Sequence, residues 1–88
     1  MPMQISPDVL EKTLGGKMVL LHLETGEYHT LNESGAVVWQ GLRLGHPRQQ
    51  IVEELARQFD APAEVLAADV DTCLQGLLQR RLITSESR

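Results

Sequence analysis

The 88-residue sequence is poor in cysteine, in aromatic residues and in long apolar runs, and each shortage excludes a class of protein. A single cysteine cannot form an internal disulfide or a thiolate zinc site. One Tyr, one Trp and one Phe are too few for the stacking platforms that bind single-stranded nucleic acid. Apolar runs such as Met18 to Leu21 are too short to span a bilayer, and the first residues show no export signal. We therefore expect a cytoplasmic protein with no membrane partner.

What the sequence does contain is typical of one small folded domain. Apolar residues make up 42% and charged residues 23%, which argues against disorder. We expect a single domain over residues 1–88, with a core from about 9 to 83 and a frayed tail over 84–88. A chain of this size has little room for a deep pocket, so composition favours a binding protein over an enzyme. The net charge of −4 argues against duplex DNA as a partner.

The first third of the chain predicts three β-strands joined by tight turns. Val9 to Leu14 ends at Gly15-Gly16, a pair that suits a sharp reversal. Lys17 to Leu23 is rich in aliphatic residues, and Glu27 to Leu31 follows the turn Glu24-Thr25-Gly26. Short loops between consecutive strands imply an antiparallel meander with the second strand in the middle.

The second turn decides which face of this sheet is buried. Its sequence fits a three-residue hairpin loop with Gly26 in the left-handed position, which places Leu23 opposite Glu27. One face, taken as the core face, then holds Val19, Leu21, Leu23 and Leu31. The other face holds Met18, Leu20, His22, Tyr28 and Thr30. A two-residue loop would shift the pairing and reassign both faces.

Three helices follow the strands. Asn32 is a good N-cap for a helix over Glu33 to Leu42, which Gly41 weakens and Gly45 ends. Pro47 fits the first position of a second helix, and Pro62 starts a third that runs to about Arg81. The apolar stripe of the second helix is Ile51, Val52, Leu55, Ala56 and Phe59, and that of the third is Leu66, Val70, Cys73, Leu74, Leu77 and Leu78. We assign Trp39, Val37, Val38, Leu55 and Phe59 to the core.

The residue pattern argues against catalysis and metal binding. His22 and His29 fall on opposite faces in the preferred register, and no His-Glu-x-x-His or Cys-x-x-Cys spacing is present. Cys73 lies mid-helix on an apolar stripe, without the neighbouring base or cation that activates a nucleophile. We therefore expect no catalytic residue, no metal and no cofactor.

The order of three strands and three helices predicts an α+β fold, with the sheet covered on one face and a winged-helix-like arrangement. A winged-helix DNA-binding protein is the first alternative. A helix that reads DNA carries Arg, Lys, Asn or Gln toward the bases, whereas the third helix here begins with Glu64, Asp69 and Asp71.

The third strand, Glu27 to Leu31, is the feature that suggests binding. In a meander it is an outer strand, and it has neither Pro nor Lys to guard its edge. Such an edge can accept an extended peptide as a further strand. On the residues alone, coverage of this edge by a helix or by a second copy is an equal alternative.

The segment from Val19 to Ala36, above all Thr-Gly-Glu-Tyr…Leu-Asn-Glu-Ser-Gly, resembles the PqqD-like family, also called the RiPP recognition element. RiPPs are ribosomally made, post-translationally modified peptides. The pattern Ile51-Val-Glu-Glu-Leu-Ala…Phe59-Asp and the spacing from Asp69 to Ile83 extend the resemblance. It spans about Val9 to Ile83 and implies a three-stranded antiparallel sheet followed by three helices.

The resemblance also implies a function and a site. Members of the family bind the leader of a precursor peptide as an added strand against the third strand, in a groove walled by the third helix. The implied backbone partners are Glu27, Tyr28, His29, Thr30 and Leu31. The implied wall is Asp69, Val70, Cys73, Leu74 and Leu77, where Val70 and Leu74 are equally well explained as core. Asp69 is either a solvated helix residue or an ion-pair partner of a basic leader residue.

Two pathways use separate proteins of this family. Pyrroloquinoline quinone proteins typically carry Leu-Ala-Pro-Glu-Arg where this sequence has Leu23-Glu-Thr-Gly-Glu-Tyr. The pattern from Gly26 to Gly35 looks more like the recognition proteins of lasso-peptide pathways. The implied partners are the leader peptide and a separately encoded leader peptidase, with the cyclase as a further candidate. A peptide chaperone of pyrroloquinoline quinone synthesis, or of another RiPP pathway, is the second alternative.

Overall fold

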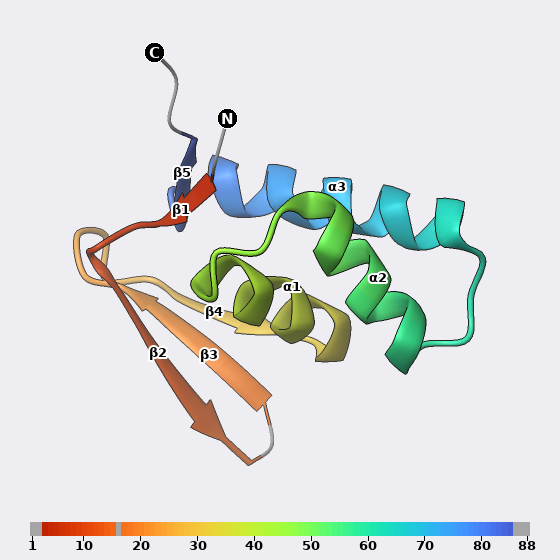
Figure 1. Cartoon of the computed structure of the whole chain (residues 1–88). Coiled ribbons are helices and arrows are strands. Elements are labelled where there is room, and N and C mark those ends of the chain that lie inside the picture. Colours follow the sequence, from red (N-terminus) through yellow and green to blue (C-terminus); the bar gives the residue numbers. More distant parts are fainter. Residues whose placement is uncertain (1–2, 16, 86–88) are drawn as a thin grey trace.

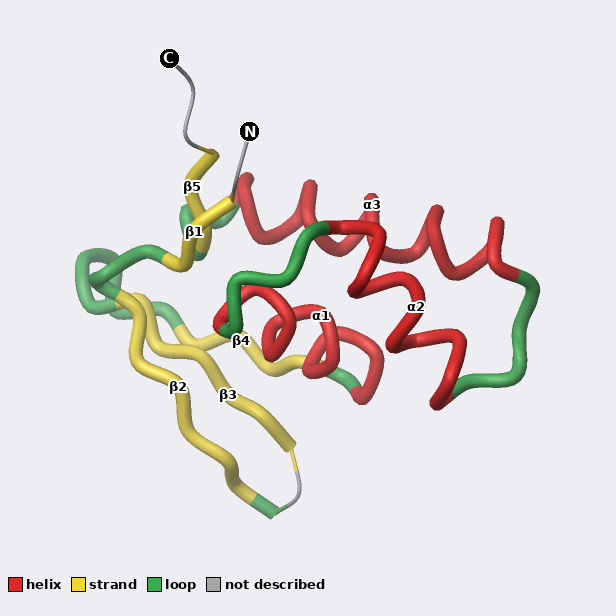
Figure 2. Tube along the Cα trace, viewed as in Figure 1, coloured by secondary structure: helices red, strands yellow, loops and turns green. Residues whose placement is uncertain are grey.

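The computed structural model describes residues 3–15 and 17–85. Within these residues, four strands come first, three helices follow, and a short strand comes last. Figures 1 and 2 show the helices gathered on one side of the strands. The elements are β1 (Met3–Ile5), β2 (Val9–Leu14), β3 (Lys17–His22), β4 (Tyr28–Leu31), α1 (Glu33–Arg43), α2 (Arg48–Gln58), α3 (Ala63–Gln79) and β5 (Ile83–Ser85). The predicted α+β fold class is confirmed.

The main sheet is antiparallel with the order β2-β3-β4, so the predicted meander with its second strand in the middle is confirmed. A second sheet was not predicted. It pairs β1 with β5, with Ile5 opposite Ile83 and Met3 opposite Ser85. The predicted start of the frayed tail at Thr84 is therefore wrong, because Thr84 and Ser85 are strand residues; positions 86–88 lie outside the described residues.

The predicted pairing of β3 with β4 is shifted by one residue, and the predicted core face of the sheet is wrong for that reason. His22 N–H donates to the Glu27 carbonyl (3.0 Å), so the loop holds four residues and not three. Met18 consequently lies opposite Leu31, and Leu20 lies opposite His29. Because side chains alternate along a strand, this one-residue shift exchanges the two faces.

The buried face therefore carries Met18, Leu20 and His22, whereas Leu23 is exposed. Leu31 is the one member of the predicted core face that does point toward the core, where it is half-buried. His22 and His29 lie on the same face and not on opposite faces.

His22 joins the sheet to the end of α3. Its side chain is 2% exposed. Its Nδ1 accepts from the Glu24 N–H (3.2 Å), and its Nε2 lies 3.1 Å from the Arg81 carbonyl. A carbonyl can only accept, so Nε2 carries the proton and the ring is a neutral bridge between the two segments.

The helices begin within one residue of the predicted positions. Asn32 caps α1 through its side chain, which accepts from the Gly35 N–H (2.7 Å). Pro47 and Pro62 were predicted to be the first residues of their helices, and each is instead the N-cap residue just before α2 or α3. Trp39 is buried, and its Nε1 donates to Glu11 Oε1 on β2 (2.8 Å).

One core lies between the sheet and the helices. It contains Met18, Leu20, Val38, Trp39, Leu42, Ile51, Val52, Leu55, Leu66, Val70, Leu74, Leu77, Leu82 and Ile83. Val37 and Phe59 pack against it in partly buried positions, while Ala56 of the predicted stripe is exposed. None of the three helices within residues 3–15 and 17–85 combines the length and the apolar character needed to cross a membrane.

We predict that His22→Ala lowers the free energy of unfolding by about 2–4 kcal/mol, because it leaves a cavity and two backbone groups without partners. Urea denaturation followed by circular dichroism measures the change. His46→Ala is the matched control, because His46 lies in a loop and is only half-buried, so its effect should be well under half as large. Equal midpoints for the two variants would contradict the bridging role of His22.

Candidate functional site

Strand β4 is an edge strand, and its free side is the start of the candidate site. No other strand within the described residues pairs with that side. Pairs in an antiparallel ladder alternate between bonded and non-bonded, and His22 with Glu27 is a bonded pair. The backbone groups of His29 and Leu31 therefore point toward β3. Those of Tyr28 and Thr30 point toward the free edge, where an added strand can bind them.

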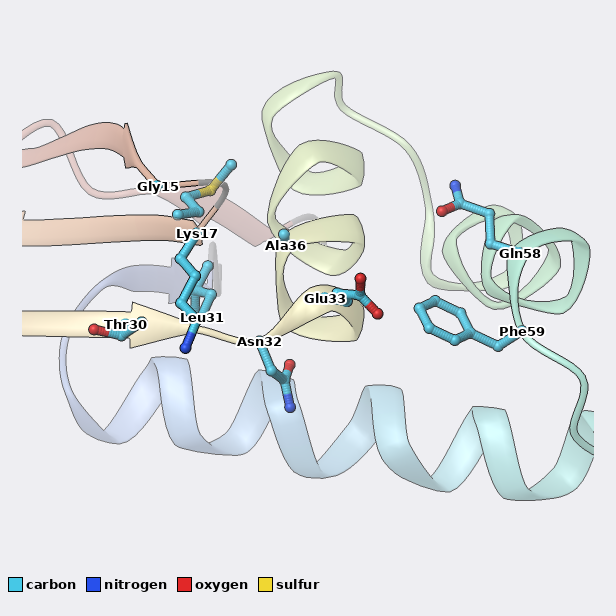
Figure 3. Close-up of a pocket in the computed structure, with 10 residues that line it drawn as sticks. Gly15, Lys17, Thr30, Leu31, Asn32, Glu33, Ala36, Gln58 and Phe59 are labelled. Carbon is cyan, nitrogen blue, oxygen red and sulfur yellow. The ribbon is translucent and has the colours of Figure 1, made fainter.

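Helix α3 faces this free edge. Its end is held beside the loop before β4 by the His22–Arg81 hydrogen bond and by the Arg81–Glu24 ion pair (Nη1 to Oε1, 3.8 Å). In Figure 3, α3 runs beneath β4, on the side away from β3. The edge of one strand and the side of one helix thus form the two walls of the site.

The structure separates the predicted wall residues of α3 into two groups. Val70, Leu74 and Leu77 are buried in the core, so they support the wall from behind. Asp69 is exposed and Cys73 is half-buried, so these two present surface. Asp71 lies on a different flank, because Arg48 of α2 binds it with two hydrogen bonds (2.6 and 2.9 Å).

The predicted residues around β4 also divide between two faces. Tyr28 and Thr30 point away from the core, and Tyr28 is 71% exposed. His29 and Leu31 point to the core side and are half-buried. Glu27 is exposed and precedes the strand that it was predicted to start.

His29 brings an unpartnered polar atom to the strand. Its Nε2 is buried and has no hydrogen-bond partner within the described residues. The nearest carboxylate oxygen given for it, Glu27 Oε1, is 3.7 Å away, beyond normal hydrogen-bond distance. Because a buried polar atom without a partner is destabilising, this nitrogen is a candidate contact for a bound peptide.

An open hollow of about 840 Å³ lies where β4 ends and α1 begins (Figure 3). Leu31, Ala36 and Phe59 give it apolar surface, and Lys17 and Glu33 add one charge of each sign. A peptide that follows the edge of β4 past Leu31 reaches this hollow. Lys17 and Phe59 were not predicted as site residues, because they come from β3 and from the end of α2, far apart in the sequence.

Two local environments shift pKa values near α3. Burial raises the pKa of the Cys73 thiol, which keeps it mostly protonated and slow to react at neutral pH. The hydrogen bonds from Arg48 hold the pKa of the Asp71 carboxyl below its usual range. No group of three or more His, Cys, Asp or Glu side chains that could hold a metal ion occurs in the part of the chain that the structure describes.

Two residues near the end of α3 were not predicted as site residues: Gly76, which is half-buried, and Arg80, the exposed C-cap residue of the helix. At 100° per residue, Asp69, Cys73, Gly76 and Arg80 follow one flank of the helix, on the side away from Asp71. A glycine in the middle of a long helix is destabilising. The presence of Gly76 there is the sequence feature that could have marked this position as a candidate site residue.

Comparisons with known proteins agree on one family. The model of the family described as coenzyme PQQ synthesis protein D (PqqD) matches residues 17–83. No curated protein matches the sequence. Two solved structures share the fold, and both are complexes with leader peptides.

The first of these structures is TbiB1 in complex with the TbiA(beta) leader peptide. It is 26% identical to this chain, with a TM-score of 0.88 over 97% of this chain and 99% of that chain. The second is lasso peptide synthetase B1 complexed with the leader peptide. It is 21% identical, with a TM-score of 0.90 over 97% of this chain and 100% of that chain.

We predict opposite effects of alanine at two helical glycines. A Cβ at Gly76 would meet only the flexible end of Arg80 (3.3 Å), so Gly76→Ala should raise the free energy of unfolding by up to about 1 kcal/mol. A Cβ at Gly41 would lie 2.6 Å from Ile51 Cγ1, so Gly41→Ala should lower it by about 1–3 kcal/mol. Urea denaturation tests both variants. A destabilised Gly76→Ala would show that this flank is packed against something and is not free.

Proposed function

The chain belongs to the PqqD family, and we propose that it is a non-catalytic adaptor that binds the leader of a ribosomally made precursor peptide. The free edge of β4 is the observation that carries this proposal. Tyr28 and Thr30 point their backbone groups outward there, and α3 faces the same edge. The leader would add as a fourth strand, with its side chains directed alternately toward α3 and away from it.

The proposed peptide-binding residues have different roles, according to where each lies on β4 or α3. Tyr28 and Thr30 supply backbone hydrogen bonds, while His29 and Leu31 contact leader side chains on the core side. Asp69 and Cys73 form the accessible part of the α3 wall, and the exposed carboxylate of Asp69 pairs with a basic leader residue. Val70, Leu74 and Leu77 hold that wall in place from the core.

We assign the adaptor to lasso-peptide biosynthesis, where it delivers the leader to a separately encoded leader peptidase. The fold shared with lasso peptide synthetase B1 over 97% of this chain supports this assignment. The segment Leu23 to Tyr28 supports it too, because it departs from the sequence typical of pyrroloquinoline quinone proteins. We expect the adaptor to act in the cytoplasm, where ribosomal precursors are made.

A peptide chaperone of pyrroloquinoline quinone synthesis is the second candidate, because the matching family model carries that description. The two candidates differ in the leader that they bind. Titration with a labelled lasso leader and with a labelled pyrroloquinoline quinone precursor, under the same conditions, separates them by affinity.

The decisive test of strand addition is Thr30→Pro. Proline removes the outward N–H of Thr30 and places its ring where the leader backbone must approach, so we expect at least a roughly tenfold loss of leader affinity. Fluorescence polarisation with a labelled leader measures it.

Thr13→Pro is the matched control. Alternation of the ladder also points the N–H of Thr13 outward, but at the opposite edge of the sheet on β2. It should leave leader affinity unchanged. If Thr30→Pro folds normally and binds the leader as tightly as Thr13→Pro does, strand addition at β4 is wrong.

Cys73 gives an independent test, because it is the chain's only cysteine and lies on the α3 wall. Its raised pKa and partial burial predict slow alkylation by iodoacetamide at neutral pH, with a rate that increases as pH rises and the thiolate forms. Saturating leader should slow alkylation further by covering the thiol. Time courses followed by mass spectrometry measure this. An unchanged rate would remove α3 from the proposed site.

A further inference from the structure

The end of α3 holds an arginine in a backbone conformation that favours glycine. Arg81 has a φ of 59°, and it is the only non-glycine residue with a positive φ within residues 3–15 and 17–85. It closes the helix in a Schellman motif: its N–H donates to the Leu78 carbonyl (3.1 Å), and the Leu82 N–H donates to the Leu77 carbonyl (2.9 Å). Glycine is the usual residue here, because a Cβ strains the left-handed conformation. The chain therefore keeps this arginine at a cost in stability.

The fold gives no reason for an arginine at position 81. Its side chain is 75% exposed, and its ion pair with Glu24 joins two exposed groups, which adds little to stability. The hydrogen bond from His22 is accepted by the backbone carbonyl of Arg81, so glycine would keep it. The helix dipole favours a basic residue near this end, but Arg80 already supplies one at a negative φ. A strained residue that the fold does not need indicates a function.

Arg80 places a second guanidinium group near the first. Arg80 is exposed, and its Nη1 lies over Gly76, because a Cβ added there would be 3.3 Å away. The Arg80 side chain thus turns back along the flank of α3 that carries Asp69 and Cys73. The arginines of α1 and α2 each form an ion pair with a carboxylate, whereas Arg80 forms none with a residue that the structure describes. Its positive charge is available to a ligand.

The two arginines lie at one end of the proposed leader site. The Arg81 carbonyl is bonded to His22 at the end of β3, and Glu24 lies in the loop that leads to β4. Figure 3 shows α3 running beneath β4 in the direction opposite to the strand. Arg80 and Arg81 are therefore beside the start of β4. Asp69, three turns earlier on the same flank as Arg80, lies nearer the end of the strand.

We propose that Arg80 and Arg81 bind a carboxylate of the leader, and that together with Asp69 they select the leader by its charges and orient it along β4. This inference rests on the proposed leader-binding function. Guanidinium groups bind carboxylates through paired, charge-assisted hydrogen bonds. The ligand is thus an Asp or Glu side chain of the leader at the start of β4, and a basic side chain of the leader lies at Asp69.

The geometry also fixes the spacing and the order of these charges. From Asp69 to Arg80 the helix rises by about 16 Å, at roughly 1.5 Å per residue. An extended leader covers this length in about five residues. Antiparallel pairing with β4 is the more stable mode, so the basic residue should precede the acidic one along the leader. A leader with the two charges exchanged would place each beside a like charge.

The test uses Arg81→Gly, because glycine removes the side chain and relieves the strain in one change. Urea denaturation measures stability, and fluorescence polarisation measures the affinity for the labelled leader of the precursor encoded beside this chain. We expect Arg81→Gly to raise the urea midpoint and yet to weaken leader binding by roughly five- to tenfold, and the loss should shrink as salt is added. Arg81→Lys keeps the charge and should lose less affinity.

Arg57→Ala is the matched control, because it removes an exposed positive charge whose ion pair, with Glu54, lies within α2. It should leave leader affinity unchanged. An exchange of charges then identifies the leader residue. Arg80→Glu should bind the natural leader at least about tenfold more weakly, because it brings like charges together. Replacing the acidic leader residue by lysine should restore binding to Arg80→Glu and weaken binding to the natural chain.

The outcomes separate this inference from the proposed function. If the natural chain does not bind the leader, the proposed function fails, and this inference fails with it. If the natural chain binds the leader, but Arg81→Gly and Arg80→Glu bind it as tightly, only the recognition of charge is wrong.

Three further results would overturn the recognition of charge. The first is an Arg81→Gly variant that is less stable than the natural chain, because Arg81 would then serve the fold. The second is a leader that binds but carries no acidic residue in its bound segment. The third is a lysine-substituted leader that restores no binding to Arg80→Glu.

Discussion

The neutral imidazole of His22, held between the Glu24 N–H and the Arg81 carbonyl, is the interaction on which the arrangement of the sheet and α3 depends. It fixes which residues of β3 are buried, because a slip of one residue would move the ring to the sheet face that points away from the helices and break both bonds. It also holds the end of α3 beside the start of β4. The position of the helical wall beside β4 and the set of β3 residues that is buried both depend on this register.

The order of elements could be predicted from the sequence because local signals mark it. Asn32, Pro47 and Pro62 begin helices, and the glycine-containing turns separate the strands. The buried face of the sheet could not be predicted, since Val19 and Leu21 compete equally with Met18 and Leu20 for the core. The pairing of β1 with β5 was also beyond local reasoning, because three-residue strands at opposite ends of the chain carry almost no pattern.

The candidate site also has a part that could be predicted from the sequence and a part that could not. That β4 is an edge strand follows from short loops and strand order, so its residues could be predicted from topology. Which side of α3 is accessible depends on where α2 packs. The Arg48–Asp71 contact between these two helices joins residues that are distant in the sequence, so it could not be predicted. The apolar stripe of α3 therefore predicted its buried residues well, but gave no reason to notice Gly76 on the accessible flank.

Under the proposed strand addition, the shortness of β4 limits how much of the leader affinity backbone hydrogen bonds can supply. Tyr28 and Thr30 each offer one N–H and one C=O, so the edge makes at most four backbone hydrogen bonds. At about 1 kcal/mol each, they correspond by themselves to a dissociation constant near the millimolar range. Side-chain contacts must supply the remaining affinity, and these are the contacts that differ between leaders. Under the proposed strand addition, a short edge thus leaves the discrimination between leaders to side-chain contacts.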